Sequence, residues 1–194
     1  MTTTLWILIA AFALADLIIL PPMIARAKRL PMDDKARADA PGQFADLSFG
    51  KTHYQWHGSN TGDIVVLVHG LSAPSFVFAA LIPFLTSAGF RVLTYDLYGR
   101  GWSDRPRDRQ SGAFFARQLT ELLDHQNVRR RVTLLGYSMG GAIVASFAVL
   151  HPDRVRNLIL LASAGFAHQT GGMVGFIRHT PLLGDWLMAV LGGG

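Results

Sequence analysis

The chain has 194 residues, of which half are apolar and only 16% are charged, and it contains no cysteine. This length suits one domain with a sizeable core. The composition excludes intrinsic disorder, a disulfide framework, thiolate zinc sites and a cysteine nucleophile. The net charge of +5 is local, because five basic residues against two acidic ones lie between residues 26 and 37. With no recognition motif elsewhere, we expect no nucleic-acid partner.

The first segment with a clear pattern is the apolar run from Leu5 to Leu20, which carries a single charge at Asp16. Its apolar residues favour insertion into a bilayer by about 3 to 6 kcal/mol, against a cost of about 2.5 to 3.5 kcal/mol for a central Asp. As a helix, residues 2–20 are about as long as the hydrocarbon core is thick, and Pro21-Pro22 should end the helix. We therefore expect residues 1–25 to form a membrane anchor helix.

A cleavable signal peptide is the rival interpretation of this segment. The residues Ala13-Leu14-Ala15 form an A-x-A site, but no basic residues precede the apolar run, and the run continues beyond Asp16. All nearby basic residues follow the segment. By the positive-inside rule we expect a single-pass membrane protein with the bulk of the chain in the cytoplasm.

The remaining chain divides into a linker and an alternating region. Residues 26–46 have mixed charge, prolines and no sustained period, which indicates a linker. From Leu47 on, apolar runs rich in branched residues alternate with helical stretches, and this pattern predicts an α/β fold with a mostly parallel sheet flanked by helices. The strands are expected at 53–56, 64–68, 92–95, 132–135 and 158–161, and the helices at 76–87, 114–126 and 140–150.

The chemistry is expected where the strand at 132–135 ends and a helix begins. There Gly136, Ser138 and Gly140 form a G-x-S-x-G pattern. The glycines permit a tight turn that lifts the serine above the sheet, and the start of the helix offers unpaired N–H groups to an oxyanion. An incidental serine in a glycine-rich turn is the alternative, and two further motifs argue against it.

The first of these motifs is His69-Gly70-Leu71, directly after the strand at 64–68, and the second is DLYGRGWSD at 96–104, directly after the next strand. With GYSMGG at 136–141 and HPDRV at 151–155, they resemble the α/β-hydrolase superfamily, in its serine-nucleophile esterase and lipase-like branch. The resemblance implies a hydrolase core at 47–165, followed by the start of a lid or cap at 166–194. It also implies Ser138 as nucleophile, with the backbone N–H groups of Leu71 and Met139 forming the oxyanion hole.

Serine at this position implies acyl chemistry, because related dehalogenases and epoxide hydrolases carry Asp there. The expected reaction is hydrolysis of an ester, thioester, amide or carbon–carbon bond through an acyl-enzyme, with no cofactor and no metal. The apolar residues of 166–194 suit a hydrophobic acyl-containing small molecule. The anchor helix adds membrane lipid as a partner, and the sequence carries no signal for an oligomeric state.

The catalytic acid and base are harder to find. The family order is Ser, acid, His, with the acid and base after later strands, so we expect the last strands to be missing and the chain to be truncated. His69 and Asp96 are expected to be structural, and Arg100 and the run 129–131 to be solvated charges on turns.

The other candidates for the catalytic acid and base differ in how close to Ser138 they are expected to lie. His151 and Asp153 follow a helix that carries them to the opposite end of the sheet. His168 or His179, with Asp185, could form a rearranged triad. Two functions therefore stay open: a membrane-anchored serine hydrolase, and a catalytically incomplete hydrolase-like protein or non-catalytic binding module.

Overall fold

The computed structural model describes residues 3–27 and 32–165 and, beyond these, Thr180, Leu183, Trp186 and Val190. The N-terminal helix and the segment Met32–Phe166 belong to two separate compact units. The elements in chain order are α1 (Thr3–Ala27), β1 (Gln43–Leu47), β2 (Gly50–His57), β3 (Ile64–Val68), η1 (Ser75–Phe78), α2 (Ile82–Ser87), β4 (Arg91–Tyr95), α3 (Gly112–His125), β5 (Val132–Tyr137), α4 (Met139–Leu150), η2 (Pro152–Arg154) and β6 (Val155–Leu161).

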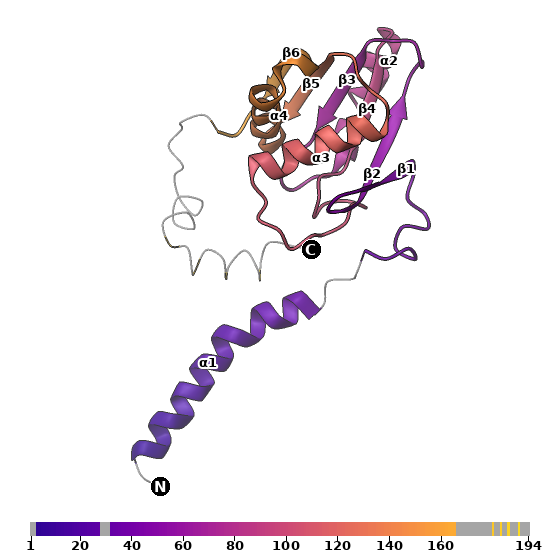
Figure 1. Ribbon diagram of the computed structural model, residues 1–194. Coiled ribbons are helices and arrows are strands. Elements are labelled where there is room, and N and C mark those ends of the chain that lie inside the picture. The colour runs from indigo at the N-terminus through magenta and orange to yellow at the C-terminus, as the bar shows by residue number, and fades with distance from the viewer. Residues whose placement is uncertain are drawn as a thin grey trace. The chain divides into compact units, whose positions relative to one another are not determined.

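The second unit is built on one six-stranded sheet with the order β1-β2-β4-β3-β5-β6. The four strands β4, β3, β5 and β6 pair in parallel, whereas β1 and β2 pair antiparallel at one edge. Helices cover both faces of the sheet (Figure 1). The expected α/β fold with a mostly parallel sheet is therefore confirmed.

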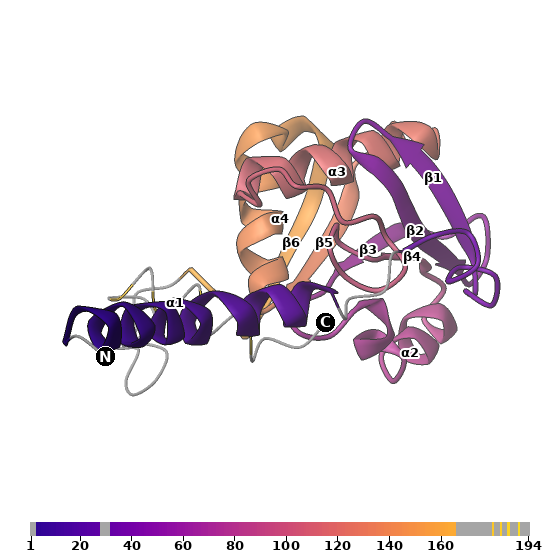
Figure 2. The same ribbon diagram turned by 90° about the horizontal axis from the view of Figure 1, so that it is seen from below.

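The apolar strands owe their composition to burial on both faces. In β3, Val66 and Val68 pack in the cluster that holds the buried residues of α3 and α4. Val65 and Leu67 point the other way and pack with Phe78 of η1 and residues of α2. Figure 2 shows α2 on the face opposite α3 and α4. A strand buried on both sides has no polar face, which explains its uninterrupted apolar sequence.

The linker prediction for residues 26–46 needs correction, because the folded unit begins at Met32. Gln43 to Leu47 form β1, which pairs with β2 from Gln43 opposite Tyr54 to Leu47 opposite Gly50. Only Ala45 of this edge strand is fully buried. A short, mostly exposed strand carries little apolar periodicity, so the sequence pattern did not predict it.

The helix expected at 76–87 is divided in two. Residues 75–78 form the 3₁₀ helix η1, and α2 begins only at Ile82. Pro83 occupies the first turn of α2, where its missing N–H is tolerated. A proline there cannot donate to the carbonyl four residues earlier, so it separates the two helices.

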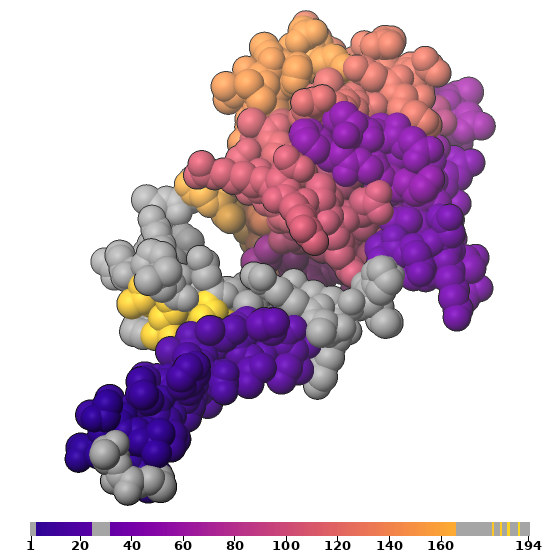
Figure 3. Space-filling model, turned by 60° about the horizontal axis from the view of Figure 1, so that its bottom comes forward, coloured from indigo at the N-terminus to yellow at the C-terminus, as the bar shows by residue number. Residues whose placement is uncertain are grey.

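The apolar helix α1 runs further than expected, because Pro21 and Pro22 lie inside it instead of ending it. Twenty-two of its residues, Thr3–Ile24, are long and apolar enough to span a membrane, and their large apolar side chains are exposed (Figure 3). Pro22 has no N–H to offer the carbonyl of Ile18. That carbonyl instead accepts a hydrogen bond from Nε1 of Trp186, at 2.6 Å.

Strand β6 lies at one edge of the described sheet. Among the described strands it pairs only with β5, and the last four of its seven residues, Leu158 to Leu161, are 38–49% exposed. Main-chain groups on its outer edge and apolar side chains are thus both accessible within the part of the chain that the structure describes. Such an edge is a template for pairing with another strand.

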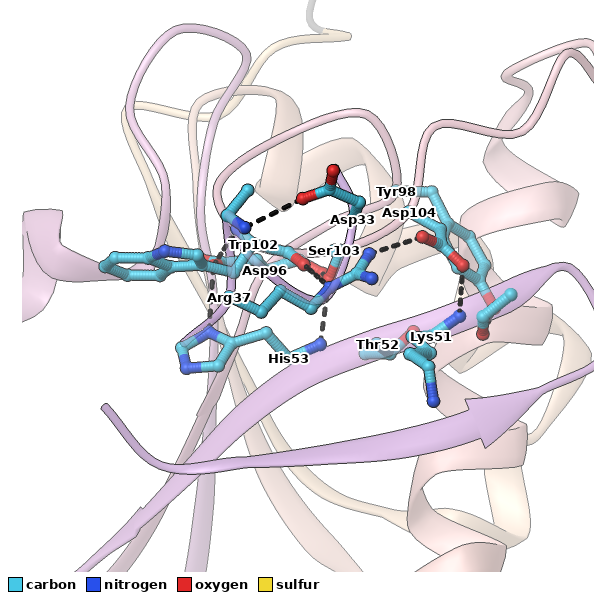
Figure 4. Close-up of polar contacts among 12 residues, drawn as sticks. Asp33, Arg37, Lys51, Thr52, His53, Asp96, Tyr98, Trp102, Ser103 and Asp104 are labelled. Carbon is cyan, nitrogen blue, oxygen red and sulfur yellow. Dashed lines mark hydrogen bonds and ion pairs between the residues drawn. The ribbon is translucent and has the colours of Figure 1, made fainter. Parts of the chain in front are cut away.

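A buried polar network joins the start of the folded unit to the loop after β4 (Figure 4). Arg37 is 8% exposed; it forms an ion pair with Asp104, and its Nε donates to the carbonyl of Trp102 at 3.1 Å. Both ring nitrogens of His53 are engaged, Nδ1 with Asp96 Oδ2 at 2.9 Å and Nε2 with the carbonyl of Pro41. The network therefore fixes residues 32–41 against the sheet.

Asp96 is the centre of this network and is fully buried. Its carboxylate also accepts hydrogen bonds from the backbone N–H of Ser75, at 2.9 Å, and of Trp102, at 3.1 Å. Burial disfavours the charged carboxylate, but the hydrogen bonds from His53, Ser75 and Trp102 outweigh it, so the pKa of Asp96 lies below its usual value. The network thus holds a buried, ionised carboxylate in place.

The lowered pKa of Asp96 predicts a loss of stability in acid. Because the pKa is lower in the folded than in the unfolded chain, the stabilisation is fully present above the ordinary value of 3.8 and is lost as the pH falls through the folded pKa. We expect Asp96→Asn to lose about 1.5 to 3 kcal/mol of unfolding free energy at pH 7 and to depend less on pH between about 5 and 3. Denaturant unfolding followed by tryptophan fluorescence measures both effects.

Asp108→Asn is the matched control, because Asp108 is exposed and makes no polar contact among the described residues. It should behave as the parent does at every pH. Equal pH profiles for the parent and Asp96→Asn would contradict the role given to the buried carboxylate.

Candidate functional site

Ser138 stands between β5 and α4 on a strained backbone. Its φ of 54° and ψ of −118° lie in a region that few residues other than glycine adopt. Its N–H donates to the carbonyl of Leu161 at 3.0 Å, and its carbonyl accepts from Gly141 and Ala164, each at 2.9 Å. These bonds tie the turn to the end of β6 and hold the serine in this conformation.

Glycines around Ser138 are required by close backbone contacts. A Cβ on Gly136 would overlap the carbonyl oxygen of Gly140, and a Cβ on Gly140 would overlap the carbonyl oxygen of Val68 in β3. A Cβ on Gly141 would overlap Ser163. The first turn of α4 therefore lies directly against the neighbouring strand, which is possible only without side chains.

The two N–H groups expected to form the oxyanion hole belong to Leu71 and Met139. Neither the N–H of Leu71 nor that of Met139 finds a hydrogen-bond acceptor among the described residues. Gly70 lies beside the serine, because a Cβ on Gly70 would be 3.1 Å from Ser138 Cβ and 3.5 Å from its Oγ. The structure thus places Gly70 beside Ser138 at the start of α4.

His69 is fully buried and has both ring nitrogens occupied. Nε2 accepts a hydrogen bond from the N–H of Leu97 at 2.9 Å, so the ring proton lies on Nδ1, which donates to the carbonyl of Gly70 at 2.8 Å. Burial lowers the pKa of His69 and favours this neutral form. With its only lone pair already accepting a hydrogen bond, His69 has no free nitrogen with which to act as a base.

The described residues do not provide a base for Ser138, since its Oγ has no hydrogen-bond partner among them. His151 and Asp153 follow the end of α4, about 18 Å along the helix from the serine. Within the described part of the chain, no group of three or more acidic or histidine side chains could hold a metal ion. The other candidates for the acid and base, His168, His179 and Asp185, lie outside the described residues.

The contacts of Arg100 were not predicted from the sequence, which indicated a solvated charge on a turn. Arg100 is half-buried and not a solvated charge, and its guanidinium donates to the carbonyl of Leu71 at 3.3 Å, to that of Tyr98 at 3.0 Å and to Oε1 of Gln110 at 2.5 Å. Gly99 and Gly101 on either side have positive φ angles of 81° and 51°. The two adjoining glycines in GRG were the only sequence signal that the loop turns sharply here.

Two glycine substitutions should separate the stability of the turn from its function. Gly140→Ala places a methyl group in a rigid backbone contact, so we expect it to destabilise the protein by about 1 to 3 kcal/mol or more. Gly70→Ala needs a shift of only a few tenths of an ångström and should leave stability near that of the parent, while its methyl group crowds Ser138. Thermal unfolding and the reaction of Ser138 with a fluorophosphonate measure the two effects. A destabilised Gly70→Ala with unchanged Ser138 reactivity would refute this division.

Known proteins resemble the chain over the region that contains this site. The sequence profile of the α/β-hydrolase fold family matches residues 63–182. A 1-acylglycerol-3-phosphate O-acyltransferase of Arabidopsis thaliana is 34% identical over 132 residues, which are 66% of this chain and 31% of that protein. A cis-3-alkyl-4-alkyloxetan-2-one decarboxylase of Shewanella oneidensis is 32% identical over 128 residues, or 63% of this chain and 39% of that protein.

A solved structure also resembles the folded part of this chain. An esterase of Exiguobacterium antarcticum superposes with a TM-score of 0.62 and 29% identity, covering 75% of this chain and 58% of the esterase. The chain therefore spans only about a third of the two curated relatives and somewhat more than half of the esterase. Since the family profile matches more than half of the chain, including β3, β5, Ser138 and α4, the chain belongs to the α/β-hydrolase fold family.

Proposed function

We propose that the chain carries the nucleophile and oxyanion hole of a serine hydrolase that acts on an ester or a related acyl substrate. One observation carries the proposal: Ser138 is held on a left-handed backbone at the point where the N–H groups of Leu71 and Met139 have no other acceptor among the described residues. Strain of this kind is maintained where function requires it. The similarity to an esterase supports the same reaction class.

In the proposed reaction Ser138 Oγ attacks the acyl carbon while a base takes the hydroxyl proton. The carbonyl oxygen becomes negative and accepts hydrogen bonds from Leu71 and Met139. The tetrahedral intermediate collapses, the bond to the leaving alcohol breaks, and the alcohol takes the proton. Water then repeats the sequence on the acyl-enzyme and releases the acid.

The segment after the oxyanion loop supports an apolar acyl group. Residues 70–90 contain no charged side chain, and Leu71, Phe76 and Val77 expose 51%, 66% and 37% of their surface. An acyl chain beside these residues would remove apolar surface from water. We therefore propose a hydrophobic acyl substrate, with a non-catalytic binding protein of the same fold as the alternative.

Labelling of Ser138 distinguishes the two. A fluorophosphonate reacts rapidly with a serine hydroxyl when a base assists it, and the described residues supply no base to Ser138. For the 194-residue chain we therefore expect slow labelling and, with p-nitrophenyl acetate, faint esterase activity at most. Ser138→Ala should abolish both, whereas Ser146→Ala, in the middle of α4, should not. Mass spectrometry of the labelled peptide identifies the modified residue.

Two outcomes would change this interpretation. Rapid labelling of the 194-residue chain that is lost in His168→Ala or His179→Ala would identify a base within residues 166–194. Activity that survives Ser138→Ala would contradict the serine mechanism and favour the binding protein.

We further propose that α1 anchors the protein in a membrane with the hydrolase unit in the cytoplasm. The helix is long and apolar enough, and basic residues follow it, which favours a cytoplasmic location for the chain beyond it. One of them, Arg37, is buried in its ion pair with Asp104, so the contribution to orientation rests on Arg26, Lys28, Arg29 and Lys35.

Fractionation and reporter fusions test this location. The protein should remain with membranes during carbonate extraction, and a green fluorescent protein at its C-terminus should be fluorescent while an alkaline phosphatase there is inactive. The reverse reporter pattern would overturn the orientation. A soluble product that begins near Asp16 would instead establish a cleaved signal peptide.

A further inference from the structure

The loop 96–104 holds the oxyanion loop at three points. Oδ1 of Asp96 accepts from the N–H of Ser75, the N–H of Leu97 donates to His69, and Nε of Arg100 donates to the carbonyl of Leu71. The first two contacts are buried and act through residues on either side of the oxyanion loop. Only the Arg100 contact reaches the residue whose N–H is the proposed oxyanion donor.

The direction of the Leu71 N–H depends on two peptide planes. In a planar trans peptide the C=O of Gly70 and the N–H of Leu71 point in opposite directions, so the bond from His69 to the Gly70 carbonyl aims the Leu71 N–H away from His69. The next peptide begins with the Leu71 carbonyl, which Arg100 holds. The two contacts together restrict rotation on both sides of the Leu71 Cα.

Arg100 is also held in position by contacts with residues other than Leu71. Its Nη1 donates to the carbonyl of Tyr98 and to Gln110, and its guanidinium lies 6.0 Å from the centre of the Phe115 ring. Donors on one planar group thus reach three acceptors in fixed directions. Lysine presents a single nitrogen on a flexible stem and cannot reproduce this arrangement.

We propose that Arg100 is a positioning residue for the oxyanion hole, which fixes the Leu71 peptide so that its N–H points at the developing oxyanion. The proposal rests on the proposed serine hydrolase function. Arg100 does not touch the reacting atoms; it acts through Leu71. Its removal should therefore affect transition-state binding more than substrate binding.

The experiment compares Arg100→Gln with Arg107→Gln in the full-length protein, with p-nitrophenyl acetate as substrate. Arg107 is exposed in the connection between β4 and α3 and has no polar partner among the described residues, so its substitution removes the same charge without the contact. The faint esterase activity expected of this chain comes from the oxyanion hole, so we expect Arg100→Gln to lower that residual kcat about 10- to 100-fold with little change in KM. Inhibition by a trifluoromethyl ketone, whose bound form is an oxyanion, should weaken by a similar factor.

Further variants cover the case in which Arg100→Gln fails to fold. Gln110→Ala removes a support of the guanidinium but leaves Arg100 in place, and Arg100→Lys keeps the charge; both should show a smaller loss in kcat and in ketone affinity than Arg100→Gln. Parental values in both variants, or equal effects of Arg100→Gln and Arg107→Gln, would overturn the proposal. Ser138→Ala, assayed in parallel, keeps the two proposals apart, since activity in that variant contradicts the serine mechanism and not only the role of Arg100.

Discussion

The close approach of α4 to β3 is the constraint on which the rest of the site depends. The helix begins against the carbonyl of Val68, and no side chain fits at Gly140. This approach forces the sharp turn at Ser138 and brings the first N–H groups of α4 alongside the segment that follows β3. One packing contact between a helix and a strand therefore positions Ser138 and the proposed donor Met139.

A second layer of contacts supports this arrangement from the antiparallel side of the sheet. Asp96 connects His53 of β2, Trp102 of its own loop and Ser75 beyond the oxyanion loop. Arg37 and Pro41 attach the start of the folded unit to the same network. Residues that precede the sheet in sequence thus contribute to the rigidity of a loop that is adjacent to Ser138.

The sequence was sufficient to predict the parallel strands and the tight turn at Ser138, because both leave local patterns. Strands buried on two faces are uninterrupted apolar runs, and the tight turn needs glycines at fixed positions around the serine. Strand β1 was missed because an exposed edge strand has no such pattern. Arg100 and Arg37 were missed for another reason: their partners, Leu71 and Asp104, are 29 and 67 residues away, and an arginine in a loop carries no local sign of burial.

The left-handed backbone of Ser138 sets a conflict between folding and reactivity. A serine in this conformation costs about 1 to 3 kcal/mol, which glycine would largely avoid. Selection for stability alone therefore acts against the side chain that the chemistry needs. A gene copy released from selection for hydrolysis could become more stable by a single change to glycine, and a thermostabilisation screen without an activity assay would favour the same loss.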